Sequence, residues 1–454
     1  MADNILTQPG GITLEELTIT ATGSGKEVTT DISNIVEEIN IFEHLQQPFM
    51  TMNLIISDAT SLFTLLPIAG EEYINIKFSL PDPAFLKNFE KKFRVISIQE
   101  IEQTISVRQV RYRLRCILPE AFNDWTKRVR KSYSEMPISE MASKICTDYL
   151  GFSEELKSSE TSGNRTIVIP NFSPVESLRF LAREAKSEKY TPSNYTFFSN
   201  GDGYFFKTLE ELIEEKPTDK YTIVEKNFFK KGDPNYRDSD GPSGRTGTNI
   251  GTKPAEFLKV IDWSFKKIFD LEDNLRRGAF DSTLFVIDPV AQLFEKKTYS
   301  YTQDYDKFKR VDRNIGGKYI WKDGELANLE GDSLHSYIIS NFGTDFENTD
   351  TKFENLHYKM AASAMLDYIT CEVVIPGDCS RRAGDVIDIV FPEFSSFDNT
   401  ISKENVFLAG TYLVTGLRHT YHPGMNGYKT IMQCVKNNYH RSVDDSHLYL
   451  KDNS

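Results

Sequence analysis

The sequence is poor in cysteine and has no long apolar run. Its five cysteines are scattered, odd in number and form no CxxC pair: Cys116, Cys146, Cys371, Cys379 and Cys434. This pattern favours a reduced, cytoplasmic folding compartment. No apolar stretch approaches the roughly 18 residues of a membrane span. The opening residues, MADNILTQPGGITLEEL, have neither the basic nor the apolar region of a signal peptide.

An excess of basic residues is also missing, since the net charge is −13 over 454 residues. That balance argues against a general nucleic-acid binder, which needs cations to neutralise phosphates. It remains compatible with a passage for DNA, whose walls should repel phosphates rather than hold them.

What the chain does contain is a large hydrophobic and aromatic fraction. Hydrophobic residues make up 39%, and Phe and Tyr number 31 and 21. The length allows about two to four domains of roughly 100–200 residues. Phe and Tyr favour strands, so we expect β-rich domains within an α+β fold.

The first 118 residues predict an antiparallel β-domain. Apolar and polar residues alternate in ITLEELTITAT, in YINIKFSL and in FRVISIQEIEQTISVRQVRYRLRCIL, with turn signals between them. Short connections of this kind are typical of a sandwich or a small barrel.

A helical or mixed insert is predicted over 119–200. Pro137 stands near one helix start, and Ser173, Pro174 and Glu176 predict a second start with a capping box. Strands return in YTFFSNGDGYFFKTL. The segment 201–254 ends in a loop over 230–254 that is nearly devoid of apolar residues.

The remaining chain is divided into four predicted parts. Strands over 255–294 and 366–440 form a second β-domain, in which GTYLVTGLRHTYHPGMNGYKTIMQCVKN is a hairpin with HPGMNG as its loop. Residues 295–365 are a mixed region inserted into that domain, with a helix at LHYKMAASAML. Residues 441–454 are a C-terminal tail.

Matching blocks in the two β-domains predict a duplication. LQQPFMTMNLIISDATSLF and LRRGAFDSTLFVIDPVAQL align Leu45 with Leu275, Leu54 with Leu284 and Asp58 with Asp288. Later blocks follow in the same order. They align Ile74, Ile76, Phe78, Val95 and Cys116 with Ile387, Ile389, Phe391, Val414 and Cys434. Strands all alternate, but a shared order of four blocks is harder to obtain by chance. The apolar positions of these blocks are the predicted core.

Several patterns that resemble chemical sites fail on spacing. The GSGK segment lacks the glycine and the Ser or Thr of a phosphate loop, so a hairpin turn explains it better. A calcium loop within DPNYRDSDG would place Tyr236 and Gly247 at ligand positions one and twelve, where carboxylates are needed.

Clustered titratable residues give no site either. His419, His422, Cys434 and His440 surround one hairpin, but positions 419 and 422 of a strand point to opposite faces. Glu184 and Glu188, predicted one helical turn apart, are interpreted as solvated charge. We interpret the repeated residues Asp58 and Asp288 as turn or N-cap residues rather than as catalytic residues. We predict no catalytic, cofactor or metal-binding residues.

The order of segments resembles one known family. The segments ISNIVEEINIFEHLQQPFMTMNLIISDATSLFTLLPIAGEEYINIKF, NFSPVESLRFLAREA, GDVIDIVFP and TYLVTGLRHTYHPGMNGYKTIMQCV are similar to baseplate hub proteins of contractile-tailed bacteriophages. Related domains occur in late control D proteins and in the N-terminal part of type VI secretion spikes.

The resemblance implies two tube domains per chain and a homotrimer that forms a pseudo-hexameric ring. Such a ring would join the six-fold tail tube to the three-fold spike, in a virion baseplate assembled in the host cytoplasm. The implied partners are the central spike, tube or tube-initiator proteins, the tape-measure protein and baseplate wedge proteins, with DNA as passing cargo. The alternatives are a hub or spike component of a non-phage injection or type VI system, and a tail-associated cell-wall hydrolase.

Overall fold

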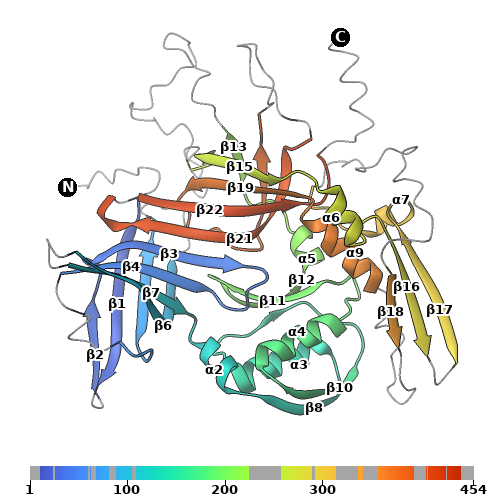
Figure 1. Ribbon diagram of the computed structural model, residues 1–454, viewed down its shortest axis with the longest axis horizontal. Coiled ribbons are helices and arrows are strands. Elements are labelled where there is room, and N and C mark those ends of the chain that lie inside the picture. Colours follow the sequence, from blue (N-terminus) through green and yellow to red (C-terminus); the bar gives the residue numbers. More distant parts are fainter. Residues whose placement is uncertain are drawn as a thin grey trace, which may run out of the picture.

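A computed structural model describes residues 11–23, 26–59, 62, 68–80, 88–104, 109–223, 257–288, 292–312, 336–340, 356–392, 405, 407–425 and 427–440. Within these ranges, strands dominate and the helices have at most 11 residues. One sheet of 14 strands runs through the molecule, with three smaller sheets beside it (Figure 1). The β-rich α+β prediction is confirmed at this level.

The first strand group comes from the N-terminal quarter of the chain. It runs in the order β2-β1-β5-β6-β7-β4-β3, and every neighbouring pair is antiparallel. Gly23 lies opposite Lys26, as expected for a hairpin around the GSGK segment. The seven strands are β1 (Thr13–Gly23), β2 (Lys26–Asp31), β3 (Val36–His44), β4 (Thr51–Asp58), β5 (Tyr73–Ser79), β6 (Phe89–Thr104) and β7 (Gln109–Ile117).

The second strand group has the order β15-β19-β22-β21-β20-β13-β14. The predicted hairpin is confirmed, with the 3₁₀ turn η4 (Pro423–Met425) between its two strands. The seven strands are β13 (Lys220–Ile223), β14 (Lys259–Val260), β15 (Asp262–Lys267), β19 (Ile369–Pro376), β20 (Val386–Val390), β21 (Gly410–His422) and β22 (Gly427–Lys436).

The two groups share strand order and register over five strands. Val95 lies opposite Cys116 between β6 and β7, and Val414 lies opposite Cys434 between β21 and β22. The register shifts directly after each of these pairs, at Val95/Ser97 and at Val414/Gly416. A β-bulge at the same place in both ladders is a specific feature, because bulges re-aim a strand at a defined point.

One block of the predicted alignment is wrong. Residues 281–288 form β16 in a separate sheet, not the counterpart of β4. That counterpart is β19, because Cys371 lies opposite Cys434 as Met52 lies opposite Cys116. Alternation alone cannot distinguish one half-buried strand from another, so the early match had no register to support it.

The outer strands of the two groups also differ. The strand β1 runs antiparallel to β5, whereas β13 runs parallel to β20. The likeness therefore covers β3, β4, β7, β6 and β5 against β15, β19, β22, β21 and β20.

The region between the groups is mixed rather than mainly helical and lies below both in Figure 1. The capping box is present: Ser173 Oγ accepts from the Glu176 N–H, and Glu176 Oε2 accepts from the Ser173 N–H. Its elements are α2 (Glu120–Thr126), β8 (Val129–Met136), α3 (Ile138–Ile145), the π-helix η1 (Cys146–Leu150), β9 (Lys157–Ser158), β10 (Arg165–Phe172), α4 (Pro174–Glu184), β11 (Tyr195–Asn200), β12 (Gly203–Thr208) and α5 (Leu209–Glu214).

A second insertion separates β15 from β19, earlier in the second group than predicted. Its sheet, in the order β17-β16-β18, projects at the right of Figure 1. The helix expected at LHYKMAASAML is present. The elements are α6 (Leu271–Arg276), β16 (Asp281–Asp288), β17 (Leu293–Ser300), α7 (Tyr301–Asp304), the 3₁₀ turn η2 (Tyr305–Lys307), β18 (Ser336–Ser340) and α9 (Leu356–Leu366).

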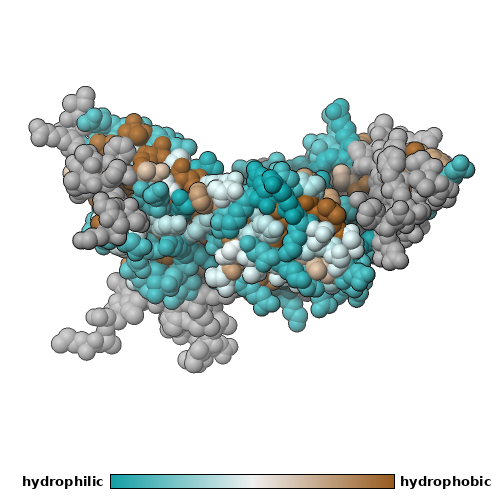
Figure 2. Space-filling view, turned by 90° about the horizontal axis from the view of Figure 1, so that it is seen from below, coloured by the Kyte–Doolittle hydropathy of each residue, from teal (hydrophilic) through white to brown (hydrophobic). Residues whose placement is uncertain are grey.

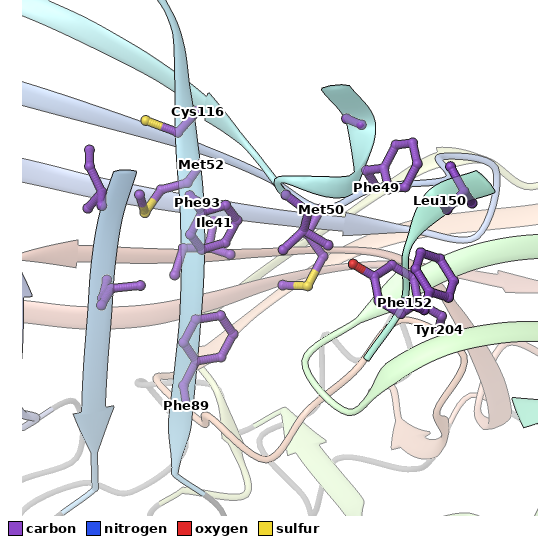
Figure 3. Packing of buried hydrophobic residues seen from close by; sticks show 14 of the residues in the cluster. Ile41, Phe49, Met50, Met52, Phe89, Phe93, Cys116, Leu150, Phe152 and Tyr204 are labelled. Atoms are coloured by element: carbon purple, nitrogen blue, oxygen red, sulfur yellow. The ribbon is translucent and has the colours of Figure 1, made fainter. Parts of the chain in front are cut away.

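The predicted core residues are buried in both groups. The side chains of Ile74, Ile76, Phe78, Ile387, Ile389 and Phe391 are at most 3% exposed. The core of the first group continues into the mixed region, since Phe49 and Met50 share one cluster with Leu150, Phe152 and Tyr204, and Phe49 lies beside Leu150 in Figure 3. The first strand group and the mixed region therefore share one hydrophobic cluster.

Candidate assembly interface

The two strand groups are joined edge to edge by β3 and β21. Six antiparallel residue pairs form this contact, from His44 opposite Gly416 to Ile39 opposite Tyr421. We call this contact the internal seam. Because it completes the backbone hydrogen bonding of both strands, it merges the two groups into one sheet.

Side chains add specific contacts across the internal seam. The Asn40 carbonyl oxygen accepts from Arg418 Nε at 2.8 Å and from Thr420 Oγ1 at 3.0 Å. The Asn40 amide donates to Glu38 Oε1 at 2.8 Å, and Arg418 also lies 3.3 Å from that carboxylate. Since Asn40 is only 5% exposed, both ends of its side chain have the partners that a buried amide needs.

A buried carboxylate lies where the two strand groups meet the mixed region. Glu43, in β3, accepts from the backbone N–H of Gly201 at 2.8 Å and from that of Ala383 at 2.9 Å. Arg382 directly precedes Ala383 in the chain, and its Nε atom lies 2.9 Å from Asp202 Oδ1. We call these five residues the carboxylate junction. Segments from three parts of the chain converge on one side chain.

Burial dominates the electrostatics of the carboxylate junction. Loss of solvation raises the pKa of Glu43 to about 7, although the Arg382 charge and the two backbone N–H groups act in the opposite direction. The junction is therefore a place where protonation affects the contact between the strand groups.

Two strand edges have no strand partner among the residues that the structure describes. One is the Ser97–Thr104 part of β6, on the side away from β7. The other is the side of β15 away from β19. In the internal seam the corresponding edges, those of β21 and β3, are paired with each other. Edge strands with free N–H and C=O groups are templates for adding another strand.

Two of the histidines around the predicted hairpin, His419 and His440, lie in separate environments. His419 is fully buried, and its Nδ1 lies 2.7 Å from Tyr428 Oη. Burial lowers its pKa to about 3, so it is neutral at ordinary pH. His440 Nδ1 lies 2.8 Å from Asp312 Oδ2. Over the described ranges, no three His, Cys, Asp or Glu side chains are grouped so that they could hold a metal ion.

A buried ion pair ties the end of β22 to the second insertion. Lys436 Nζ lies 2.6 Å from Asp312 Oδ2, and the two side chains are 0% and 1% exposed. The Lys436 ammonium also donates to the Ala409 carbonyl at 2.6 Å. Burial alone would raise the pKa of Asp312, but His440 and Lys436 outweigh that effect and hold it below its ordinary value. Such a group is structural, because every charge in it has a partner.

The other acidic candidates do not come together. The helix α4 ends at Glu184, so the prediction that Glu188 lies one helical turn further on is wrong. Asp58 ends β4 opposite Val110, with its side chain 3% exposed. Asp288 ends β16, and its side chain lies outside the described residues, as does the whole loop 230–254. The turn or N-cap role of the two aspartates stays a prediction.

The surface has no continuous apolar face in the view of Figure 2, where hydrophobic residues form separate groups among hydrophilic ones. No helix among the described residues is long and apolar enough to cross a membrane.

Comparison with known proteins finds likeness in structure alone. No protein-family model matches the sequence, and no curated protein is similar to it. A tail protein from Neisseria meningitidis has a TM-score of 0.53 at 10% identity, covering 92% of this chain and 96% of its own. The 43 kDa tail protein of prophage MuSo2 from Shewanella oneidensis has a TM-score of 0.52 at 10% identity, covering 93% and 98%. The chain therefore has the fold of phage tail proteins along nearly its whole length.

Proposed function

We propose that the chain is a structural component of a phage tail, the central hub of a contractile baseplate. The observation that carries this proposal is the pair of strand groups joined edge to edge in one chain, with a common strand order and a bulge at the same position. We interpret the groups as two copies of one tube domain. Their likeness to phage tail proteins in fold is consistent with this role.

The duplication has a use in an assembly of mixed symmetry. Three copies of the chain present six similar domains, so the trimer forms a pseudo-hexameric ring. One face of that ring matches the six-fold tail tube, and the other matches the three-fold spike. The ring is the conduit for DNA and the tape-measure protein, and baseplate wedge proteins bind around it. It acts in the virion tail baseplate and assembles in the host cytoplasm.

Mass photometry of the purified chain over a range of concentrations, followed by electron microscopy of the largest species, tests this role. We expect a particle of three chains with six similar densities around a central opening. A chain that remains monomeric at high concentration, alone and with its spike protein, would contradict the ring.

The hub acts without catalysis. Among the described residues, Asp58 is buried at the end of β4, and His419 is buried with its Nδ1 atom 2.7 Å from Tyr428 Oη. A cell-wall zymogram of the purified chain tests this part of the proposal. We expect no cleared band, and a lytic band at the mass of the chain would favour a tail-associated hydrolase instead.

A further inference from the structure

We infer that a patch of cations and aromatic rings beside the first strand group binds an acidic, amphipathic helix of a partner protein. The patch consists of Tyr73, Lys92, Arg94, Phe122 and Trp125, and we call it the cation–aromatic patch. The inference goes beyond the proposed function, because it assigns a surface and the chemistry of its partner and does not require a ring.

Three elements build the cation–aromatic patch. Tyr73 begins β5 and stands opposite Arg94 of β6. Phe122 and Trp125 belong to α2, which follows β7 and lies just below β6 and β7 in Figure 1. Residues three positions apart are neighbours on one face of a helix, so Trp125 lies beside Phe122.

Stacking of cations on rings holds these side chains in place. Lys92 Nζ lies 4.3 Å from the centroid of the Tyr73 ring, and Arg94 Cζ lies 5.8 Å from the same centroid. Arg94 Cζ also lies 4.0 Å from the centroid of Phe122. All three distances are within the range of cation–π attraction. Because Arg94 Nε also donates to the Gly70 carbonyl at 2.8 Å, the guanidinium is positioned before any partner binds.

The two cations of the patch form no ion pair among the described residues. Other basic residues on the same face of the sheet do form such pairs. Lys77 lies 3.3 Å from Glu15, and Arg113 lies 2.7 Å from Glu100. In a chain of net charge −13, two adjacent cations that lack an acidic partner suit the carboxylates of another molecule.

The rings of α2 add apolar contact area to this charge. The side chains of Phe122 and Trp125 are 41% and 51% exposed. Trp, Tyr and Arg are the residues most enriched among those that contribute strongly to binding at protein interfaces. The patch therefore combines exposed aromatic anchors with positive charge.

The second strand group has an equivalent face. Each group has a valine–cysteine pair before its bulge. The residue before that valine is Arg94 in the first group and Leu413 in the second, and opposite them stand Tyr73 and Val386. The N–H of the valine donates across the ladder at 2.9 Å in both groups, which supports this equivalence.

In the second group this face is apolar and covered by a helix. Val386 and Leu413 are fully buried, in one cluster with Leu212 and Ile213 of α5. The sequence of α5 is LEELIE, a short helix that is both apolar and acidic. The counterparts of these two residues in the first group are only half-buried. A helix of another protein can therefore take, on the first group, the place that α5 takes on the second.

These observations define the chemistry of the partner. Its helix needs Leu or Ile side chains three or four positions apart, which lie against Phe122 and Trp125. Glutamates or aspartates beside them pair with Lys92 and Arg94. The same two cations disfavour a basic helix.

Fluorescence anisotropy of the full chain with a synthetic probe tests the inference. The probe is a fluorescein-labelled peptide of about 18 residues, built from Leu and Glu at helical spacing. The matched control peptide carries Gln in place of Glu. We expect the dissociation constant of the Glu peptide to be at least about tenfold lower, with a difference that shrinks as salt is added. The net charge of −13 opposes binding of an acidic peptide, so equal affinities of the two peptides would overturn the inference.

Two variants locate the binding on the patch. Lys92→Glu and Trp125→Ala should each raise the dissociation constant of the Glu peptide at least about tenfold. Both side chains are exposed, so the fold is retained. Lys216→Glu is the control for charge, because Lys216 is exposed in the segment after α5 and its substitution changes the net charge equally. Equal affinities of Lys92→Glu and Lys216→Glu would contradict the assigned surface.

The same variants distinguish other occupants. A labelled oligothymidine that binds more tightly than the Glu peptide, and that Lys92→Glu releases, would assign the patch to nucleic acid and overturn the inference. Smaller assemblies of Lys92→Glu in mass photometry, without peptide binding by the wild type, would assign it to a contact between copies. Wild-type trimers that bind neither probe would overturn the inference and leave the proposed ring intact.

Discussion

The Glu43 carboxylate and the backbone N–H of Ala383 lie 2.9 Å apart, although 340 positions separate them in the chain. This hydrogen bond and the one from Gly201 hold three parts of the chain around one acidic side chain.

The pKa of Glu43, raised to about 7 by burial, makes the fold sensitive to pH. Its ordinary pKa of 4.5 applies to the unfolded chain, so the folded protein keeps a proton that the unfolded chain has lost between pH 4.5 and 7. The contribution of Glu43 to the free energy of unfolding is therefore full below pH 4.5. It falls by about 3 kcal/mol as the pH rises to 7.

Chemical denaturation of the wild type and Glu43→Gln at several pH values measures this effect. The free energy of unfolding of the wild type, minus that of the variant, should become smaller as the pH rises from 4.5 to 7, because only the wild type loses stability through Glu43. A difference that stays constant over this range would show that Glu43 does not titrate there.

Removal of the cation from the buried pair should be costly. Lys436→Met removes the ammonium group that lies 2.6 Å from the buried Asp312 carboxylate, and we expect a loss of about 3–5 kcal/mol in the free energy of unfolding. Lys131→Met is the matched control, because its pair with Asp148 is about half exposed and should contribute less than about 1 kcal/mol. Similar losses in urea unfolding would argue against an enclosed pair.

Ser173→Ala removes one half of the capping box at α4. We expect a loss of about 1 kcal/mol, because the Glu176 N–H then lacks its acceptor. Thermal unfolding followed by circular dichroism measures the change. Ser153→Ala, in an exposed loop, should leave the unfolding temperature unchanged; an equal shift in both variants would mean that the cap contributes nothing specific.

Gly410 has φ +108°, and a Cβ atom there would meet the Asp312 carboxylate and the His440 ring. Gly410→Ala should therefore destabilise the fold by more than about 1 kcal/mol. Gly424 has open space around its Cβ position and no such φ, so Gly424→Ala is the control. Equal stability of the two variants in denaturant titration would contradict the strained geometry at Gly410.

Local signals in the sequence predicted local structure well. The start of α4 depends on three neighbouring residues, Ser173, Pro174 and Glu176, and the bounds of α9 follow from one apolar segment. The hairpin of β21 and β22 was also predicted, because its loop residues and its alternation occur together.

Contacts between distant segments could not be predicted from the sequence. Nothing local to Glu43 indicates that Gly201 and Ala383 donate to it, since the acceptor and its donors come from three different regions. The match of Asp58 to Asp288 failed for a related reason. Strand partners are set by register and packing, and two amphipathic strands look alike until their neighbours are known. The charged run in GDCSRRAGD, flanked by apolar strands, is a local signal for a buried polar turn.

The internal seam can form only after β21 has been synthesised, so pairing of the β3 edge is delayed during translation. Its contacting residues Asn40 and Arg418 are 378 positions apart. At about 5–20 residues per second, the ribosome reaches Arg418 roughly 20 to 75 s after it has made Asn40. For that time the β3 edge of the nascent chain has no strand partner from β21. During this time the unpaired β3 edge carries the negative charges of Glu37, Glu38 and Glu43. Their repulsion disfavours premature pairing between neighbouring nascent chains.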